Sequence, residues 1–247
     1  MATATQEFVI EVAGRSALEG SRRRIQETLE RVGFAVIRGL LDPREVRAEY
    51  QRLVAAFDAS RDIRRSGPIR FTMANFQRLD CGDYAQVNAR LSRMMTRFFW
   101  NPDGMFSGAL QAMQTIRDRM LARTVVYQDG CYDWNEQRYY ELPKILQYPA
   151  GGGFLASHYD GYNSDGVFNI GMSVTRRGED FTDGGLYYKF RSGEECAMEE
   201  MLQPGDLYLH DAEAVHGVHA VDATAPLDLT RLTGRVAVLL SSERLAA

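Results

Sequence analysis

Apolar residues in the first sixty positions recur first at the spacing of an amphipathic helix and then as a short continuous run. The pattern predicts a helix over 21–32 that ends at Gly33, and a strand over 34–37. Asp42, followed by proline, is typical of a helix N-terminus, because aspartate caps free backbone N–H groups and proline suits the first turn. A second helix is therefore predicted over 42–57.

The middle of the chain combines an arginine-rich segment with a further stretch of helical spacing. Residues 60–80 contain many arginines and a central Gly-Pro pair, which predicts a loop. Apolar residues over 84–123 are spaced as on helices, and the turn sequence at 101–104 predicts that two helices form there. Their Met and Phe stripes are interpreted as helix core.

Beyond residue 140 the pattern changes to short apolar runs separated by glycine and aspartate. Strands are predicted over 143–148, 154–160, 167–175, 185–190, 195–202, 206–210, 214–221 and 235–241. Such strands are typical of β-sandwiches and barrels. The chain is therefore predicted to be an α+β protein with a single domain over 1–247. Helices of a helix-rich part (1–140) pack on one sheet of a β-barrel core (141–247).

The composition is that of an ordinary globular protein and argues against several classes of function. Of 247 residues, 45% are apolar and 25% charged, and the net charge of −4 gives no reason to expect nucleic acid as a partner. The three cysteines form no CxxC pair, so neither a disulfide framework nor a thiolate zinc site is predicted. Neither a leader-like N-terminus nor a run of about 18 apolar residues is found, so we expect a cytoplasmic protein without a membrane partner.

The candidate chemistry lies in histidines and one aspartate. His158 and Asp160 are two residues apart, so on a strand their side chains point to the same face. A histidine from another strand would complete two imidazoles and one carboxylate, the ligand set of non-haem Fe(II) oxygenases. His216 and His219 compete for this place, since residues three apart face opposite ways on a regular strand. His210 could also join them, giving a cupin-like site with three histidines.

Several segments around these residues resemble the iron- and 2-oxoglutarate-dependent dioxygenases. The sequence Pro-Gly-Asp-Leu-Tyr-Leu at 204–209, followed by Val-His-Gly-Val at 215–218, resembles the turn, strand and distal histidine of that family's double-stranded β-helix. Four further similar pieces, in the family's order, lie at 33–42, 146–149, 183–186 and 234–238. The resemblance covers roughly residues 30–58 and 142–242.

This resemblance implies a jelly-roll (double-stranded β-helix) fold and a dioxygenase that uses Fe(II), 2-oxoglutarate and O2, with ascorbate as an optional reductant. It implies that His158, Asp160 and His216 are the metal ligands and the catalytic centre. Succinate and CO2 would be released as a C–H bond of the substrate is oxidised. Relatives that halogenate have a small residue in place of the aspartate. The intact Asp160 therefore implies oxygen transfer, or desaturation, ring closure or epimerisation.

The far carboxylate of 2-oxoglutarate needs a cation, and arginine binds carboxylates with two parallel hydrogen bonds. The resemblance implies that Arg235, at the start of the last strand, is this anchor, with Arg231 as the alternative and Tyr148 as a neighbour of the co-substrate. Many relatives carry serine or threonine two residues after the arginine, where this chain has Ala237. Candidate replacements for that hydroxyl are Ser173, Thr175 and Tyr148.

The predicted substrate is a small organic molecule of specialised or amino-acid metabolism, which we expect to be hydroxylated. The arginine-rich loop 60–80, the aromatic segment 124–142 and the loop 161–166 are expected to face the substrate, because loops on a rigid barrel usually set specificity. A peptidyl hydroxylase of prolyl-hydroxylase type is the second hypothesis, and a cupin-like metal protein that does not use 2-oxoglutarate is the third. The sequence leaves the oligomeric state open.

Overall fold

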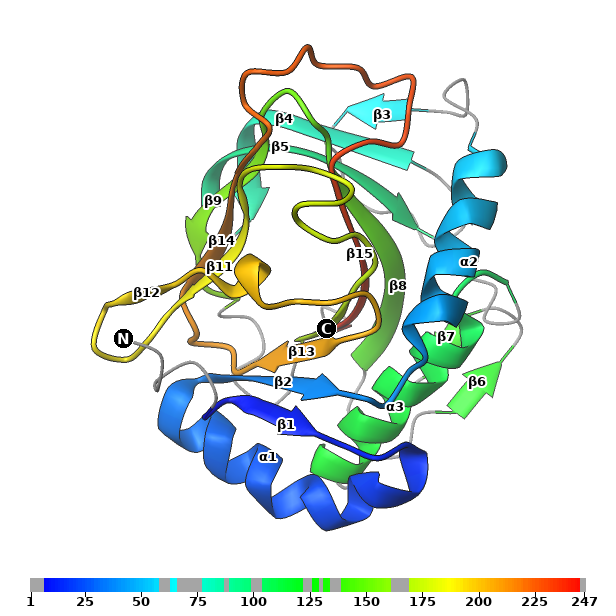
Figure 1. The fold of residues 1–247 in the computed structure, drawn as a ribbon, viewed down its shortest axis with the longest axis vertical. Helices are drawn as coiled ribbons and strands as arrows, with labels where there is room; N and C mark the ends of the chain where they lie inside the picture. Colours follow the sequence, from blue (N-terminus) through cyan, green and yellow to red (C-terminus); the bar gives the residue numbers. More distant parts are fainter. Residues whose placement is uncertain are drawn as a thin grey trace.

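A large curled β-sheet forms the centre of the molecule (Figure 1). The computed structural model describes residues 7–57, 63–65, 77–86, 89–98, 104–121, 126–128, 131–133, 139–160 and 169–244. Across the sheet, neighbouring strands are β1 (Val9–Glu11), β2 (Phe34–Arg38), β13 (Leu207–His210), β10 (Asn169–Ser173), β15 (Arg235–Arg244), β8 (Tyr139–Tyr148), β5 (Ala89–Phe98), β9 (Gly153–His158), β14 (His216–Val221), β11 (Gly185–Lys189) and β12 (Glu195–Cys196). Beside β5 lie β4 (Gln77–Gln86) and then β3 (Ile63–Arg65), while β6 (Val126–Gln128) and β7 (Cys131–Asp133) form a separate pair.

Three helices cover the outer face of one side of this sheet: α1 (Leu18–Val32), α2 (Pro43–Ala55) and α3 (Ser107–Leu121) (Figure 1). Their apolar side chains share one core cluster with alternate residues of β2, β10, β13 and β15. The side chain of Asp42 caps α2 by accepting the backbone N–H of Arg44 at 2.8 Å. These observations confirm the helices predicted over 21–32 and 42–57, and the packing of helices on one sheet.

The helix predicted for residues 84–100 is wrong, because this segment forms the strands β4 and β5 instead. β5 lies between β8 and β9, and both Met94 and Met95 are buried although successive strand residues face opposite sides. A strand covered on both faces needs no alternation of apolar and polar residues, so its pattern can imitate a helix. The second predicted helix, after the turn at 101–104, is confirmed as α3.

The strands predicted in the second half of the chain form, with one partial exception. Of the strand predicted over 195–202, only Glu195–Cys196 (β12) pairs with β11, and a 3-10 turn, η3 (Met198–Glu200), follows it. Residues 235–238 and 240 of β15 are buried, so both faces of this part of the strand are covered. Part of the loop predicted over 60–80 forms β3 and the start of β4, and the loop expected at 161–166 lies outside the described residues.

The register of three neighbouring strands lines up the residues that face the interior of the barrel. Across β5, β8 and β15, Tyr148 lies opposite Arg235, and Leu146 lies between Thr96 and Ala237. Directly paired residues share a face, so both rows point into the same interior. Glycine at position 171 leaves room for a ring from β13: a Cβ there would lie 2.2 Å from Cζ of Tyr208.

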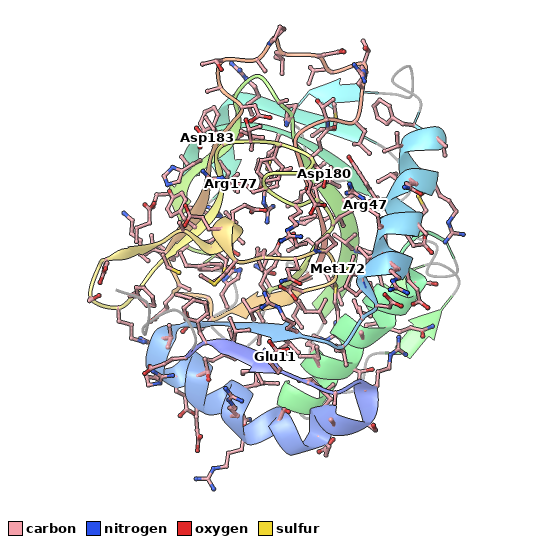
Figure 2. The ribbon with its side chains drawn as sticks, in the orientation of Figure 1. Glu11, Arg47, Met172, Arg177, Asp180 and Asp183 are labelled. Atoms are coloured by element: carbon pink, nitrogen blue, oxygen red, sulfur yellow. The ribbon has the colours of Figure 1, made fainter. Side chains whose placement is uncertain are left out.

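Ion pairs join α2 to the loop before β11 and link residues within that loop. Arg47 of α2 donates from Nη1 to Asp180, in the loop before β11, at 2.7 Å (Figure 2). In the same loop, Arg177 pairs with Asp183 at 3.2 Å. Within the described segments, no helix is both long enough and apolar enough to cross a membrane.

Candidate active site

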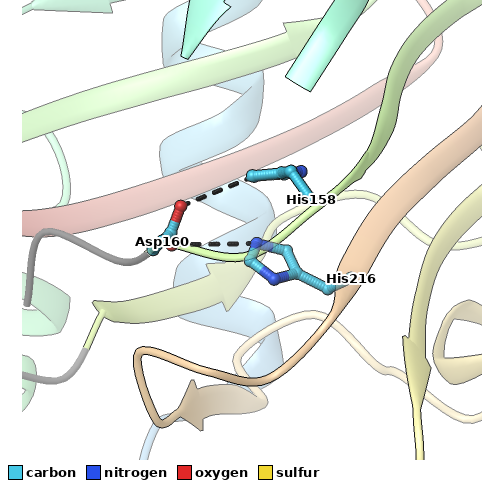
Figure 3. Close-up of side chains that lie close together, drawn as sticks. All are labelled: His158, Asp160 and His216. Carbon is cyan, nitrogen blue, oxygen red and sulfur yellow. Dashed lines mark ion pairs between the residues drawn. The ribbon is translucent and has the colours of Figure 1, made fainter. Parts of the chain in front are cut away.

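Two histidines and one aspartate meet at one end of the barrel interior (Figure 3). His158 is the last residue of β9 and His216 the first of β14, and the two strands pair these residues directly. Asp160 follows β9 by two residues. Its Oδ1 lies 3.5 Å from Nε2 of His158, and its Oδ2 lies 3.8 Å from Nε2 of His216. One ligand atom from each residue lies within 4.8 Å of the others, so all three can reach a single metal ion.

Hydrogen bonds to the backbone fix the orientation of both imidazoles. Nδ1 of His158 lies 2.9 Å from the carbonyl oxygen of Ala156, and Nδ1 of His216 lies 2.9 Å from that of Ala214. Each Nδ1–H donates to its carbonyl, which leaves Nε2 as the free lone pair that faces Asp160. Metal-bound histidines are commonly held in this way.

The carboxylate of Asp160 is held from the other side by Asn169, the first residue of β10. Nδ2 of Asn169 donates to Oδ2 of Asp160, and Oδ1 of Asn169 is a buried atom without a hydrogen-bond partner among the described residues. The amide therefore fixes the plane of the carboxylate without competing for its second oxygen. The sequence indicated that Asn169 could lie near the metal, but loop and turn roles explain an asparagine equally well, so no contact with Asp160 was predicted.

The electrostatics of the cluster give the protonation states that a metal requires. Burial lowers the pKa of His216 to about 3, helped by the neighbouring His210, and burial also lowers the pKa of His210. Burial alone raises the pKa of Asp160, but its interactions with His158, His216 and His210 outweigh burial, and the net shift is downward. At neutral pH the cluster thus offers a carboxylate beside imidazoles whose lone pairs are free.

The two remaining histidines occupy different environments. His210, at the end of β13, is buried at the cavity wall, with its ring centre 4.3 Å from that of His216 and its Nε2 3.7 Å from Oδ2 of Asp160. His219 is exposed and binds Glu195 at 2.6 Å. His216 and His219 therefore face opposite ways, as strand alternation predicts.

A buried guanidinium lies at the other end of the same cavity. Arg235 is 2% exposed, its Nε donates to Oε2 of Glu199 at 2.5 Å, and its Cζ lies 5.7 Å from the ring centre of Tyr148 and 5.9 Å from that of Tyr208. Nη2 of Arg235 is buried and has no hydrogen-bond partner within the described part of the chain. Arg231 is exposed, and the described residues that line the cavity do not include it.

The hydroxyl groups proposed to compensate for Ala237 differ in their availability. Oγ of Ser173 donates to the carbonyl of Thr175, and Oγ1 of Thr175 bonds the backbone of residue 236, so both are already engaged. Tyr148 lines the cavity beside Arg235. Thr96 lines it as well, with a buried Oγ1 that has no partner among the described residues. Thr96 was missed because its segment was predicted to be a helix.

The cavity joins these two polar ends through an otherwise largely apolar interior. The described residues that line it are Met94, Thr96, Lys144, Leu146, Tyr148, Leu155, His158, Asp160, Asn169, Leu186, Tyr188, Tyr208, His210, His216, Val218, Arg235 and Leu239. The donor set fits ferrous iron, since imidazole and carboxylate suit that metal and leave positions open. The unpartnered Nη2 fits a carboxylate, because a buried donor without a partner is costly unless a ligand satisfies it.

Comparison with proteins of known structure identifies the fold family. No protein-family profile matches the sequence, and no curated protein matches it. A prolyl-4-hydroxylase of Pseudomonas putida has a similar structure, with TM-score 0.55 and 16% identity over 93% of this chain and 100% of that chain. A Trichoplax adhaerens prolyl hydroxylase, in complex with a hypoxia inducible factor peptide fragment, gives TM-score 0.57 and 15% identity over 93% and 91%.

An enzyme of nogalamycin biosynthesis, a non-haem, α-ketoglutarate-dependent epimerase, is also similar in structure. Its TM-score is 0.52 and its identity 15%, over 93% of this chain and 88% of that chain. A 2-oxoglutarate–Fe(II) oxygenase family protein from Caulobacter crescentus gives TM-score 0.54 at 13% identity, over 95% and 86%. This chain therefore has the double-stranded β-helix fold of the 2-oxoglutarate- and Fe(II)-dependent oxygenases.

Proposed function

We propose that this protein is an Fe(II)- and 2-oxoglutarate-dependent oxygenase that oxidises, most simply by hydroxylation, a C–H bond of a small organic molecule. One observation carries the proposal. A single cavity holds a two-histidine, one-carboxylate cluster at one end and, at the other, a buried arginine with a nitrogen that has no partner among the described residues. A dicarboxylate that chelates a metal through one end and binds arginine through the other fits this arrangement.

The roles of the polar residues follow from their positions. His158, Asp160 and His216 would hold the iron through atoms that already face one another. Iron, 2-oxoglutarate and O2 together supply the oxidising chemistry, with succinate and CO2 as by-products. Asn169 keeps the Asp160 carboxylate in the orientation that binding requires, because its amide occupies one lone pair of Oδ2.

Arg235 would bind the far carboxylate of 2-oxoglutarate through its Nη edge, since its Nε is already occupied by Glu199. Tyr148 and Tyr208 wall this end of the cavity with their rings, which excludes water and strengthens the ionic contact. Arg231, being exposed, has no part in this proposal.

The apolar part of the cavity would exclude bulk water from the reacting centre. Met94, Leu155 and Val218 are buried there, next to the histidine cluster. A dry wall of this kind orients an organic substrate by shape and protects a reactive centre from side reactions.

A peptide is the second candidate substrate. It is favoured by the structural similarity to two prolyl hydroxylases, one of them solved with a peptide. The similarity to an epimerase makes epimerisation the leading alternative to hydroxylation. A cupin-like site without 2-oxoglutarate is the third candidate, because His210 lies beside the cluster as a third imidazole.

Thermal unfolding tests the proposal without knowledge of the substrate. The melting temperature is measured with Mn(II) or Fe(II) alone, with 2-oxoglutarate alone, and with both under nitrogen. A ligand that binds the folded state raises the melting temperature, so we expect a rise with metal and a further rise with 2-oxoglutarate. A response to metal but none to 2-oxoglutarate would instead support the cupin-like site. Succinate release from pools of metabolites and of peptides then separates the two substrate classes.

A further inference from the structure

Glu199 is a buried carboxylate that contacts the proposed anchor and has no part in the proposed metal site. It belongs to the 3-10 turn η3, between β12 and β13, and is 3% exposed. Its Oε2 accepts two hydrogen bonds, one from Nε of Arg235 at 2.5 Å and one from the backbone N–H of Leu186 at 2.9 Å. Glu199 is therefore fixed by the start of β11 while it holds the guanidinium.

The backbone beside Glu199 is shaped to let its side chain pass. Gly185 has a φ of 113°, and a Cβ at this position would lie 2.3 Å from Cγ of Glu199. Any other residue at 185 would displace the glutamate from Arg235. The glycine at 185, in the Gly-Gly turn at 184–185, is therefore needed so that the side chain of Glu199 can reach Arg235.

The geometry of the pair leaves one edge of the guanidinium for a ligand. Glu199 contacts Nε alone, whereas Nη2 is buried without a described partner. The rings of Tyr148 and Tyr208 lie within 6 Å of the guanidinium carbon, at 5.7 Å and 5.9 Å. A guanidinium held only by aromatic rings could rotate about its stem, but one whose Nε is bonded to a fixed carboxylate cannot turn its fork away.

We propose that Glu199 is a positioning residue for co-substrate binding, because its carboxylate holds Nε of Arg235 and so directs the Nη edge toward the far carboxylate of 2-oxoglutarate. This inference rests on the proposed function. The positioning role requires only that an acceptor oxygen of residue 199 reaches Nε of Arg235. The negative charge of Glu199 does not help, because it neutralises Arg235 and so works against the binding of an anion.

Two substitutions separate reach from charge. Glu199→Gln keeps an acceptor oxygen at the same distance without the charge, whereas Glu199→Asp keeps the charge on a side chain about 1.5 Å shorter. The dissociation constant of 2-oxoglutarate is measured by calorimetry with Zn(II) bound, so that no oxidation occurs. We expect Glu199→Gln to bind 2-oxoglutarate at least as tightly as the wild type. Glu199→Asp should bind it about tenfold more weakly, the loss typical of a charge-assisted hydrogen bond.

The outcomes are distinct. A wild-type protein that fails to bind 2-oxoglutarate with Zn(II) would overturn the proposed function itself. A wild type that binds, with a Glu199→Asp variant that binds equally well, would overturn only the positioning role. Weak binding by Glu199→Gln together with normal binding by Glu199→Asp would show that charge matters and reach does not, which also contradicts the proposal.

A measurement on the wild type keeps the inference testable where Glu199→Asp does not fold. The Nε–H resonance of Arg235, assigned by its loss in Arg235→Lys, should be protected from exchange with solvent. It should stay protected when 2-oxoglutarate binds the Zn(II) form, because the ligand uses the other edge. Loss of this protection on binding would mean that the ligand displaces Glu199, and the proposal would be wrong.

Discussion

Replacement of Arg235 by methionine gives the sharpest test of the cavity as we describe it. The variant keeps most of the volume but leaves the Glu199 carboxylate buried with the N–H of Leu186 as its remaining contact among those described. Removal of one partner of a buried ion pair typically costs about 3–5 kcal/mol. At about 2–4 °C per kcal/mol for a chain of this size, the melting temperature should fall by roughly 6–20 °C.

The same substitution should abolish binding of 2-oxoglutarate and leave metal binding intact, because the histidine cluster lies at the other end of the cavity. At a ligand concentration of about 100 times the dissociation constant, binding stabilises the folded state by about 2.7 kcal/mol. The wild type with Zn(II) should therefore gain roughly 5–11 °C from 2-oxoglutarate, and Arg235→Met should gain none. Arg231→Met is the matched control, since this arginine is exposed and should keep the full gain.

A double variant separates the two consequences. Arg235→Met combined with Glu199→Leu replaces the ion pair by apolar side chains of similar volume, a change that is often neutral or stabilising. Its melting temperature should return close to that of the wild type, while 2-oxoglutarate still has no effect. A double variant as unstable as Arg235→Met alone would refute the reasoning on stability. A loss of the 2-oxoglutarate response in Arg231→Met, with Arg235→Met unaffected, would refute the anchor.

Three further predictions concern other parts of the site. His216→Ala should lose the rise in melting temperature that Mn(II) causes, whereas His219→Ala should keep it; equal responses would contradict the ligand set. The pKa of His216 is lowered from about 6.5 to about 3, so below about pH 6.5 the unfolded state binds a proton that the folded state does not. The free energy of unfolding of the metal-free protein should then fall by about 1.4 kcal/mol per pH unit, and a urea midpoint that is constant from pH 7.5 to 5 would contradict this. Gly171→Ala adds a methyl group 2.2 Å from Cζ of Tyr208, so it should destabilise the fold by about 1–3 kcal/mol and weaken 2-oxoglutarate binding, as calorimetry would show; unchanged values would mean that the ring has another position to occupy.

The sequence was sufficient to bring His158 and Asp160 together because their signal is local, whereas the choice of His216 as the third residue came from the family resemblance. His158 and Asp160 are two residues apart at the end of one strand, and strand periodicity alone puts them on one face. The same periodicity separates His216 from His219. The cap at Asp42 is equally local, because the side chain bonds a backbone N–H two residues away. In each case the physical interaction spans no more than three residues of the chain.

Residues 84–100 could not be assigned correctly for the opposite reason. β5 pairs with β4 along one edge and with β8 and β9 along the other, and β8 and β9 lie more than 40 residues further along the chain. With Met94 and Met95 both buried, the apolar pattern gives no alternation to report this pairing. Thr96, the residue after Met95 in the same strand, was therefore missed together with the strand.

Metal ligands and the residues that orient the site thus differ in how they can be found. Glu199 reaches Arg235 from 36 residues earlier in the chain, and Asn169 reaches Asp160 from nine residues later. Neither contact can be predicted from a fixed spacing in the sequence, because each depends on where another segment of the chain packs against the barrel. A chain can therefore keep the local ligand motif unchanged while such contacts vary, and the affinity for 2-oxoglutarate would change with them. If Glu199→Asp leaves this affinity unchanged, the contact between Glu199 and Arg235 does not affect it, and this distinction is wrong.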